Sequence, residues 1–148
     1  MSRKKLIIFP FNGNGVEALD CIDFDEYDFI GFIDDDTNKI SEHYQIFSRE
    51  ILHKHNELCV LAVPGSSFSF KKRRGIINSL NIDNSRYVTL IHKNAAIGRN
   101  VKVGYNCLIM AGVVLTSNAE VQNHVCILPL QATPAKLEVE LITPFQPL

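Results

Sequence analysis

Residues 91–127 read IHKNAAIGRNVKVGYNCLIMAGVVLTSNAEVQNHVCI, and an aliphatic residue occupies every sixth position of this stretch. The series consists of Ile91, Ile97, Val103, Ile109, Leu115, Val121 and Ile127. Four residues after most of these positions stands a second small or apolar residue: Ala95, Val101, Cys107, Val113, Ala119 or Val125. With roughly a quarter of the chain aliphatic, such a run in one register has chance odds on the order of 10⁻⁴.

A period of six residues predicts a β-helix. An α-helix repeats at about 3.6 residues and a strand at two, so neither explains the series. In a β-helix with three flat faces, each face takes six residues and places one aliphatic side chain inside. Successive coils then stack at the strand spacing of about 4.8 Å. We therefore expect residues 87–129 to form a short parallel β-helix of about two coils.

The first half of the chain, residues 1–86, predicts a small parallel α/β domain. Hydrophobic runs predict strands at residues 6–9, 29–33 and 58–63, with a short edge strand at 44–47. Helical spacing is found at residues 16–22, 51–55 and 73–80. The Asn-Gly-Asn-Gly turn at residues 12–15 follows the first strand, and three aspartates, residues 34–36, end the second. Glycine permits a tight turn, and a helix start behind it offers N–H groups to phosphate.

The composition is that of a globular protein without metal or disulfide staples. The 148 residues are 46% hydrophobic and 21% charged, with a net charge of -1, which removes a global basic field as a reason to bind nucleic acid or anionic membrane. No apolar run approaches the roughly 18 residues that span a bilayer, and the N-terminus has no signal-peptide pattern. The cysteines and histidines lack metal-site spacing. We expect a cytoplasmic protein with reduced cysteines: Cys21, Cys59, Cys107 and Cys126.

Four segments carry a resemblance to a known family: residues 4–9 (KKLIIF), 13–15 (GNG), 31–36 (GFIDDD) and 87–92 (YVTLIH). With the six-residue series, they resemble the hexapeptide-repeat nucleotide-sugar acetyltransferases of the bacillosamine N-acetyltransferase and sialic acid O-acetyltransferase type. The resemblance implies a Rossmann-like nucleotide-sugar-binding domain at residues 1–86 and a left-handed β-helix at 87–129. It further implies a UDP-sugar substrate, acetyl-CoA as co-substrate and a homo-trimer that binds acetyl-CoA between subunits.

The resemblance also implies which residues would bind the nucleotide sugar. Gly13, Asn14 and Gly15 would let the backbone approach a phosphate, and Asp34 and Asp35 would accept hydrogen bonds from ribose or uracil. The alternative is that the glycines only form a turn and the aspartates only solvate a strand end. Lys71, in the basic run 71–74, could likewise hold a phosphate of either substrate or simply lie at a solvated helix start.

The resemblance does not extend to the family's catalytic base. Acetyl transfer to an amine or hydroxyl needs a group that removes the nucleophile's proton. The family's histidine pattern, aliphatic-x-His-(Asp/Glu)-x-x-Ile-Gly, is missing, and Ser117 and Asn118 stand at the comparable point. His124, at an outward position of its hexad, is the remaining catalytic candidate, whereas His92 opens the array and reads as structural.

Residues 130–148 differ from the rest of the chain. They contain three prolines and no hexads. A shifted reading frame across the codons of residues 128–142 can encode an Ile-Gly hexad with a Ser-His pair ahead of it. We hypothesise a frameshift near codons 127–130, which would leave a truncated β-helix, an altered tail and no catalytic coil. The nucleotide sequence of the gene tests this hypothesis.

Several functions stay open. The leading prediction is an acetyl-CoA-dependent sugar acetyltransferase whose activity is impaired by loss of the catalytic coil. The alternative is a catalytically silent nucleotide-sugar-binding module. A regulator that binds NAD or CoA through the α/β half is disfavoured by the absence of a full Gly-x-Gly-x-x-Gly motif. A hexad-type carbonic anhydrase would need three metal-binding histidines, and the array contains only His92 and His124.

Overall fold

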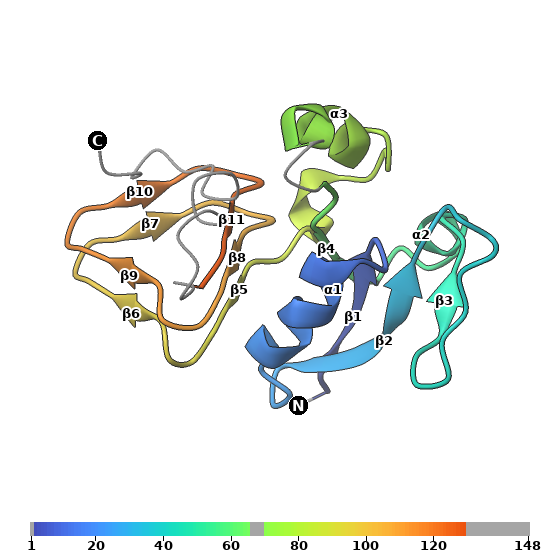
Figure 1. Ribbon diagram of the computed structural model, residues 1–148, viewed down its shortest axis with the longest axis horizontal. Helices are drawn as coiled ribbons and strands as arrows, with labels where there is room; N and C mark the ends of the chain where they lie inside the picture. Colours follow the sequence, from blue (N-terminus) through green and yellow to red (C-terminus); the bar gives the residue numbers. More distant parts are fainter. Residues whose placement is uncertain (1, 66–69, 130–148) are drawn as a thin grey trace.

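The computed structural model describes residues 2–65 and 70–129, in which a parallel sheet flanked by short helices lies beside a stack of two-residue strands (Figure 1). The sheet and its helices occupy the first half of the chain, and the stack occupies the second half. Both expected structural classes are therefore present, in the expected order along the chain. The tail at 130–148 and its frameshift hypothesis lie outside the described residues.

The sheet contains four parallel strands in the order β3-β2-β1-β4. These are β1 (Lys4–Phe9), β2 (Tyr27–Ile33), β3 (Ile46–Phe47) and β4 (Cys59–Ala62). The apolar run of β1 lies in the centre of the sheet, and its residues Leu6, Ile7 and Ile8 are 0% exposed. The edge strand is shorter than the expected 44–47, and Tyr44 lies before it with its ring edge-on to Phe32.

Short helices connect the strands. They are α1 (Gly13–Glu17) with the 3-10 turn η1 (Ala18–Cys21), α2 (Ile51–Lys54), η2 (Phe70–Lys72), α3 (Arg73–Asn78) and η3 (Asn84–Arg86). The first helix begins at Gly13 rather than at the expected residue 16, because Asn12 caps it by accepting a hydrogen bond from the N–H of Gly15. None of the helices in the described part of the chain is long and apolar enough to cross a membrane.

The second half forms three parallel ladders around one interior. The strands are β5 (Leu90–Ile91), β6 (Ala96–Ile97), β7 (Lys102–Val103), β8 (Leu108–Ile109), β9 (Val114–Leu115), β10 (Glu120–Val121) and β11 (Cys126–Ile127). They pair as β5-β8-β11, β6-β9 and β7-β10, so each strand pairs with the one three hexads away. Each strand ends on a residue of the six-residue series. From Cys107 on, that interior is closely packed, with Ile109, Leu115 and Val121 at most 4% exposed.

The corners between the strands have a common backbone conformation. Five residues spaced by six have a positive φ: Asn100, Asn106, Gly112, Asn118 and His124. Asparagine and glycine tolerate this left-handed region better than most residues. His124 therefore stands where the other corners have asparagine or glycine.

The two halves share a hydrophobic core. On the β5-β8-β11 ladder, Leu90, Leu108 and Cys126 form one row, and each is at most 9% exposed. Successive strand residues point to opposite sides, so this row faces away from the interior of the stack. It packs with Leu6 and Ile8 of the sheet and with Cys21 of η1. This outward apolar row is the part of the stack that the sheet covers.

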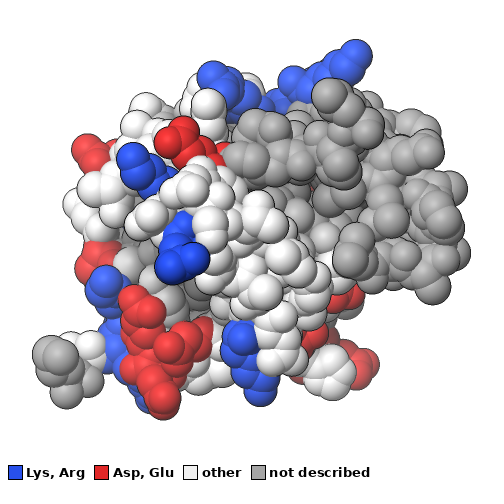
Figure 2. Space-filling model, turned by 90° about the vertical axis from the view of Figure 1, so that its left-hand side faces the viewer, with Lys and Arg blue, Asp and Glu red and all other residues white. Residues whose placement is uncertain are grey.

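The surface carries charges of both signs. Figure 2 shows lysines and arginines interspersed with aspartates and glutamates on the visible face. All four cysteines are free; Cys21, Cys107 and Cys126 are buried, whereas Cys59 is half-buried.

Candidate functional site

The loops at the carboxyl ends of β1, β2 and β4 are tied together. The Asn12 side chain accepts from the N–H of Gly15 at 2.8 Å and donates to the carbonyl of Val63 at 3.3 Å. Gly15 is buried against the loop before α1, where a Cβ would lie 2.4 Å from the carbonyl oxygen of Pro10. A side chain at position 15 would therefore displace the loop. Gly13, in contrast, has open space around an added Cβ.

Asp34 joins two of these loops through its carboxylate. Oδ2 accepts from the N–H of Phe11 at 3.0 Å and from Nζ of Lys39 at 2.9 Å, and Oδ1 accepts from the N–H of Asp36 at 2.9 Å. Burial raises the pKa of Asp34, but the hydrogen bonds from Lys39, Asp36 and Phe11 outweigh that effect, and the pKa lies below its usual value. Asp34 is thus ionised and holds the turn that contains Gly13 and Gly15 beside the end of β2.

Asp35 points to a different neighbour. Its two oxygens accept from Nε and Nη2 of Arg49 at 2.7 and 2.8 Å. The same guanidinium donates to the carbonyl and hydroxyl of Ser79 and lies 5.2 Å from the centroid of the Phe9 ring. This bidentate ion pair connects the end of β2 to the segment that follows α3.

The predicted binding residues therefore fall into three places. One group lies together at the carboxyl ends of β1 and β2: Gly13, Asn14, Gly15 and Asp34, of which Asn14 is half-buried and Gly13 is exposed. Asp35 is the next residue in the chain, but its carboxylate pairs with Arg49. Lys71 is exposed in η2, and within residues 2–65 and 70–129 no hydrogen bond or ion pair joins it to the Gly13–Asp34 group.

His124 lies at a corner of the stack, at the outer edge of β4. Its ring meets the rings of Tyr87 and Tyr105 edge-on, at centroid distances of 5.7 and 5.3 Å. Its backbone N–H donates to the carbonyl of Tyr105, and its carbonyl accepts from Arg73. Burial lowers the pKa of His124, and the charges of Arg73 and Arg74 lower it further.

Asn106 determines how the His124 ring is protonated. Its Oδ1 accepts from the N–H of Ala62 at 2.7 Å, and its Nδ2 donates to the carbonyl of Ala62 at 2.9 Å, so the Ala62 peptide fixes the orientation of the amide. The second hydrogen on Nδ2 then faces Nδ1 of His124 at 3.0 Å. Nδ1 must accept, and the neutral ring carries its proton on Nε2. A general base at Nε2 would need the opposite tautomer, which would direct an N–H at the Asn106 N–H.

Sequence reasoning did not identify Asn106, although it is 0% exposed and bonded to both halves. The available signal was the series of asparagines and glycine at the corners of the stack. Only the three-dimensional structure shows that the Asn106 corner meets the free edge of β4.

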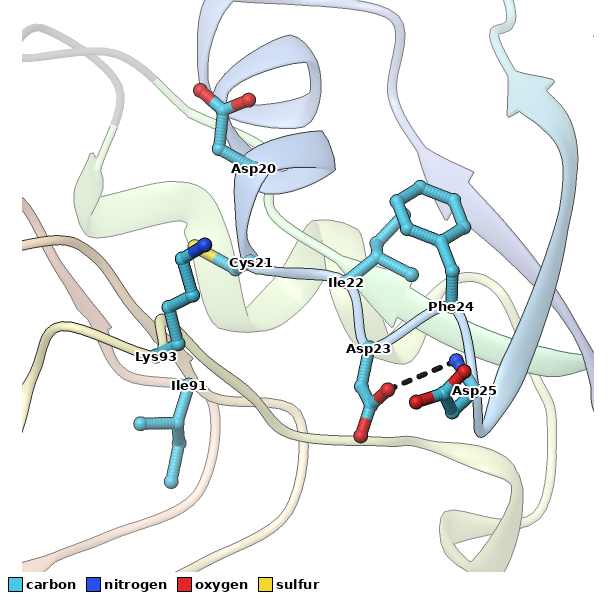
Figure 3. Close-up of a pocket in the computed structure, with 8 residues that line it drawn as sticks. All are labelled: Asp20, Cys21, Ile22, Asp23, Phe24, Asp25, Ile91 and Lys93. Atoms are coloured by element: carbon cyan, nitrogen blue, oxygen red, sulfur yellow. Dashed lines mark hydrogen bonds between the residues drawn. The ribbon is translucent and has the colours of Figure 1, made fainter.

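A pocket of about 520 Å³ lies between the η1–β2 turn and β5 (Figure 3). Its lining comprises Asp20, Cys21, Ile22, Asp23, Phe24, Asp25, Ile91 and Lys93. Burial, followed by the charges of two nearby carboxylates, raises the pKa of Cys21 to about 11, so its thiol is a poor nucleophile. In Figure 3, Asp20 points away from Asp23 and Asp25. Within the described residues, no group of three or more histidines, cysteines or carboxylates could hold a metal ion.

Comparison with known proteins gives structural similarity only. No protein-family model matches the chain, and no curated protein matches it in sequence. Among solved structures, the acetyltransferase domain of PglB from Neisseria gonorrhoeae in complex with acetyl coenzyme A is 16% identical, with a TM-score of 0.66 over 86% of this chain and 62% of that chain. PerB from Caulobacter crescentus in complex with CoA and GDP-perosamine is 15% identical, with a TM-score of 0.63 over 87% of this chain and 61% of that chain.

A third similar structure, WeeI from Acinetobacter baumannii AYE, is 16% identical, with a TM-score of 0.60 over 84% of this chain and 60% of that one. The chain therefore spans about three fifths of the length of these proteins. At this level of identity the similarity establishes the fold, a parallel α/β unit followed by a β-helix-like stack.

Proposed function

We propose that this chain belongs by descent to the nucleotide-sugar acetyltransferases, and that it binds a nucleotide-activated sugar. In this proposal residues 1–86 are a Rossmann-like nucleotide-sugar-binding domain and residues 87–129 are a left-handed hexapeptide-repeat β-helix. The observation that carries it is the shared fold: similar solved structures contain acetyl-CoA, or CoA with GDP-perosamine. Because both kinds of substrate are cytoplasmic metabolites, the proposal places the protein in the cytoplasm.

The proposed nucleotide site is the sheet edge where Gly13, Asn14, Gly15 and Asp34 lie together. Gly13 has open space on its Cα, so a phosphate could approach the backbone there closely. Asp34 would keep that turn in place through Phe11. Asp35 and Lys71 remain proposed contacts: Asp35 through carboxylate oxygens that Arg49 also contacts, and Lys71 through its exposed ammonium group.

A homo-trimer with acetyl-CoA bound between its subunits is part of the proposal. The outward residues of the β6-β9 ladder are Ala96 and Val114, both exposed, with Val114 at 63%, whereas the outward residues of the β7-β10 ladder are Lys102 and Glu120. One uncovered face of the stack is therefore apolar, as an intersubunit contact requires.

The acetyl-transfer step rests on His124, the candidate base from the sequence. Deprotonation of a sugar amine or hydroxyl by Nε2 would require the ring to change tautomer and lose its hydrogen bond from Asn106. This favours the second candidate function, a catalytically silent nucleotide-sugar-binding module. Loss of the catalytic coil through a frameshift-derived tail would likewise leave a chain that binds the nucleotide sugar without transferring acetyl.

Titration calorimetry and an assay of CoA release separate these functions. UDP-sugars, GDP-sugars and acetyl-CoA are titrated into the full chain, into Gly13→Ala and into Gly75→Ala, which also has open space around the new Cβ. We expect Gly13→Ala to weaken nucleotide-sugar binding about tenfold or more by blocking the backbone approach, and Gly75→Ala to leave it unchanged. Failure of every nucleotide sugar to bind would refute the proposal.

The release assay then decides between enzyme and binding module. CoA release that falls on His124→Ala would establish catalysis by this chain. Nucleotide-sugar binding without CoA release would establish the silent module.

A further inference from the structure

A second polar pocket lies on the other side of β4, beyond the free edge of the sheet. It measures about 220 Å³, and its lining consists of Arg74, Asn78, Asn84, Tyr105, Gln122, Asn123 and His124. These residues come from α3, from η3 and from two corners of the stack. Arg74 is the charged residue among them, and no carboxylate is included in this lining.

The interactions around the pocket direct hydrogen-bond donors into it. Nδ1 of His124 is occupied by the buried Asn106, so the polar atom that His124 can offer to the pocket is Nε2, which carries the proton. Oδ1 of Asn123 accepts from the N–H of Tyr105 at 2.9 Å, which leaves the Nδ2 hydrogens of Asn123 as its donors. Arg74 adds guanidinium donors. These three side chains together favour a ligand that supplies oxygen acceptors.

The electrostatics favour a negative charge in the same place. Arg73 lies behind the His124 corner, where it donates to the carbonyls of Pro64 and His124. The positive charges of Arg73 and Arg74 act on the imidazole, and each lowers the pKa of His124. A cation is therefore disfavoured, and an anion with several oxygens suits both the donors and the potential.

We propose that this pocket is a phosphate-binding site in which Arg74 and Nε2–H of His124 donate to the phosphate oxygens. It lies beyond β4, whereas the proposed nucleotide site lies at the turn between β1 and α1. Asn106 is a positioning residue of the site, because the Ala62 peptide fixes its amide and the amide fixes the imidazole. The phosphate could be free inorganic phosphate or the diphosphate of a bound nucleotide, and both present the same oxygens.

Inorganic phosphate is the first probe, titrated into the full chain and three variants by calorimetry. Arg74→Gln removes the charge, and His124→Asn removes Nε2–H while keeping a residue type that other corners of the stack carry. Lys72→Gln is the control, because Lys72 is exposed on the same helix start and does not line the pocket. We expect about tenfold weaker binding for Arg74→Gln, a clear loss for His124→Asn and no change for Lys72→Gln.

A nitrogen NMR spectrum of ¹⁵N-histidine-labelled protein adds a readout that a purely structural role would not move. His124 should show the Nε2–H tautomer, and phosphate should shift its Nε2 resonance. UDP and uridine then identify the source of the phosphate. If Arg74→Gln weakens the binding of UDP but not that of uridine, the pocket holds the diphosphate. If Arg74→Gln weakens only the binding of inorganic phosphate, the pocket holds the free anion. The proposal is overturned if phosphate and UDP bind equally well to Arg74→Gln and the unchanged chain, if neither binds, or if His124 carries its proton on Nδ1. None of these results depends on Gly13→Ala, so the proposed function is tested separately.

Discussion

Replacing Asn106 by leucine tests whether one buried amide joins the two halves of the molecule. Asn106 is 0% exposed, and its amide pairs with both polar groups of Ala62 at the outer edge of β4. Leucine has nearly the same shape but no donor or acceptor. The variant therefore keeps the packing of the corner and leaves the Ala62 N–H and carbonyl buried without their partner.

The expected loss follows from these groups and from the backbone. A buried backbone group without a partner lowers stability by about 1–3 kcal/mol, so two such groups remove about 2–6 kcal/mol in total. Asn106 has a φ of 55°, and a leucine in this left-handed region adds about 1–2 kcal/mol. Since domains have a free energy of unfolding of about 5–15 kcal/mol, the variant should be folded but much less stable.

Asn118→Leu is the matched control. Asn118 occupies the equivalent corner with a φ of 67°, but its side chain is exposed. Urea denaturation of the two variants should therefore share the backbone effect and differ by the two unpaired groups. With a slope of about 2 kcal/mol per M, the midpoint of Asn106→Leu should lie about 1–3 M below that of Asn118→Leu. Equal midpoints would refute the reasoning, because the buried amide would then contribute nothing beyond its backbone conformation.

Three further predictions concern the sheet edge and the buried thiol. Gly13→Ala should change the free energy of unfolding by no more than about 1 kcal/mol. In the same urea assay Gly15→Ala should lower the free energy of unfolding by about 1–3 kcal/mol, because its Cβ would lie 2.4 Å from the carbonyl oxygen of Pro10. Equal effects of the two variants would contradict this close contact. Asp34 has a lowered native pKa, so its ionised form stabilises the fold above the unfolded-state pKa of about 4, and this contribution is lost as the pH falls through the native pKa. Asp34→Asn should thus lower the urea midpoint at pH 7 but not near pH 2, and a pH-independent difference would rule this out. The raised pKa of Cys21, about 11, leaves about one thiol in a thousand ionised at pH 8, so peptide mass spectrometry should find Cys21 modified by a disulfide reagent far more slowly in the folded chain than in urea.

The six-residue series predicted the positions of the paired strands because a β-helix repeats one simple requirement. Each flat face needs an inward aliphatic residue at the same point, and all seven strands end on one, from Ile91 to Ile127. The α/β half was predicted less accurately, since the start of α1 depends on the Asn12 cap and β3 extends only as far as its backbone pairs with β2. Those interactions join residues that sequence patterns treat separately.

The candidate site was harder to predict because chemical roles depend on partners. Asp34 and Asp35 are adjacent in the chain, yet one carboxylate holds the turn that contains Gly13 and Gly15, and the other pairs with Arg49. His124 was selected as a base for its residue type and its outward position in the hexad. Its tautomer depends on Asn106, which lies in the preceding coil and is itself fixed by Ala62.

The attachment of the stack to the sheet depends on a second periodicity, of three hexads rather than one. The residue before each aliphatic position faces outward, and on one face this residue is Leu90, Leu108 or Cys126, all buried against the sheet. On the β6-β9 ladder the outward residues are the exposed Ala96 and Val114, and on the β7-β10 ladder they are the exposed Lys102 and Glu120. Packing the larger row of Leu90, Leu108 and Cys126 against the sheet removes it from water, so the residues at this position of the repeat mark the side on which the α/β unit docks. Asn106 lies directly before this face, and the docking therefore brings its amide to β4 and directs Nε2–H of His124 toward the polar pocket.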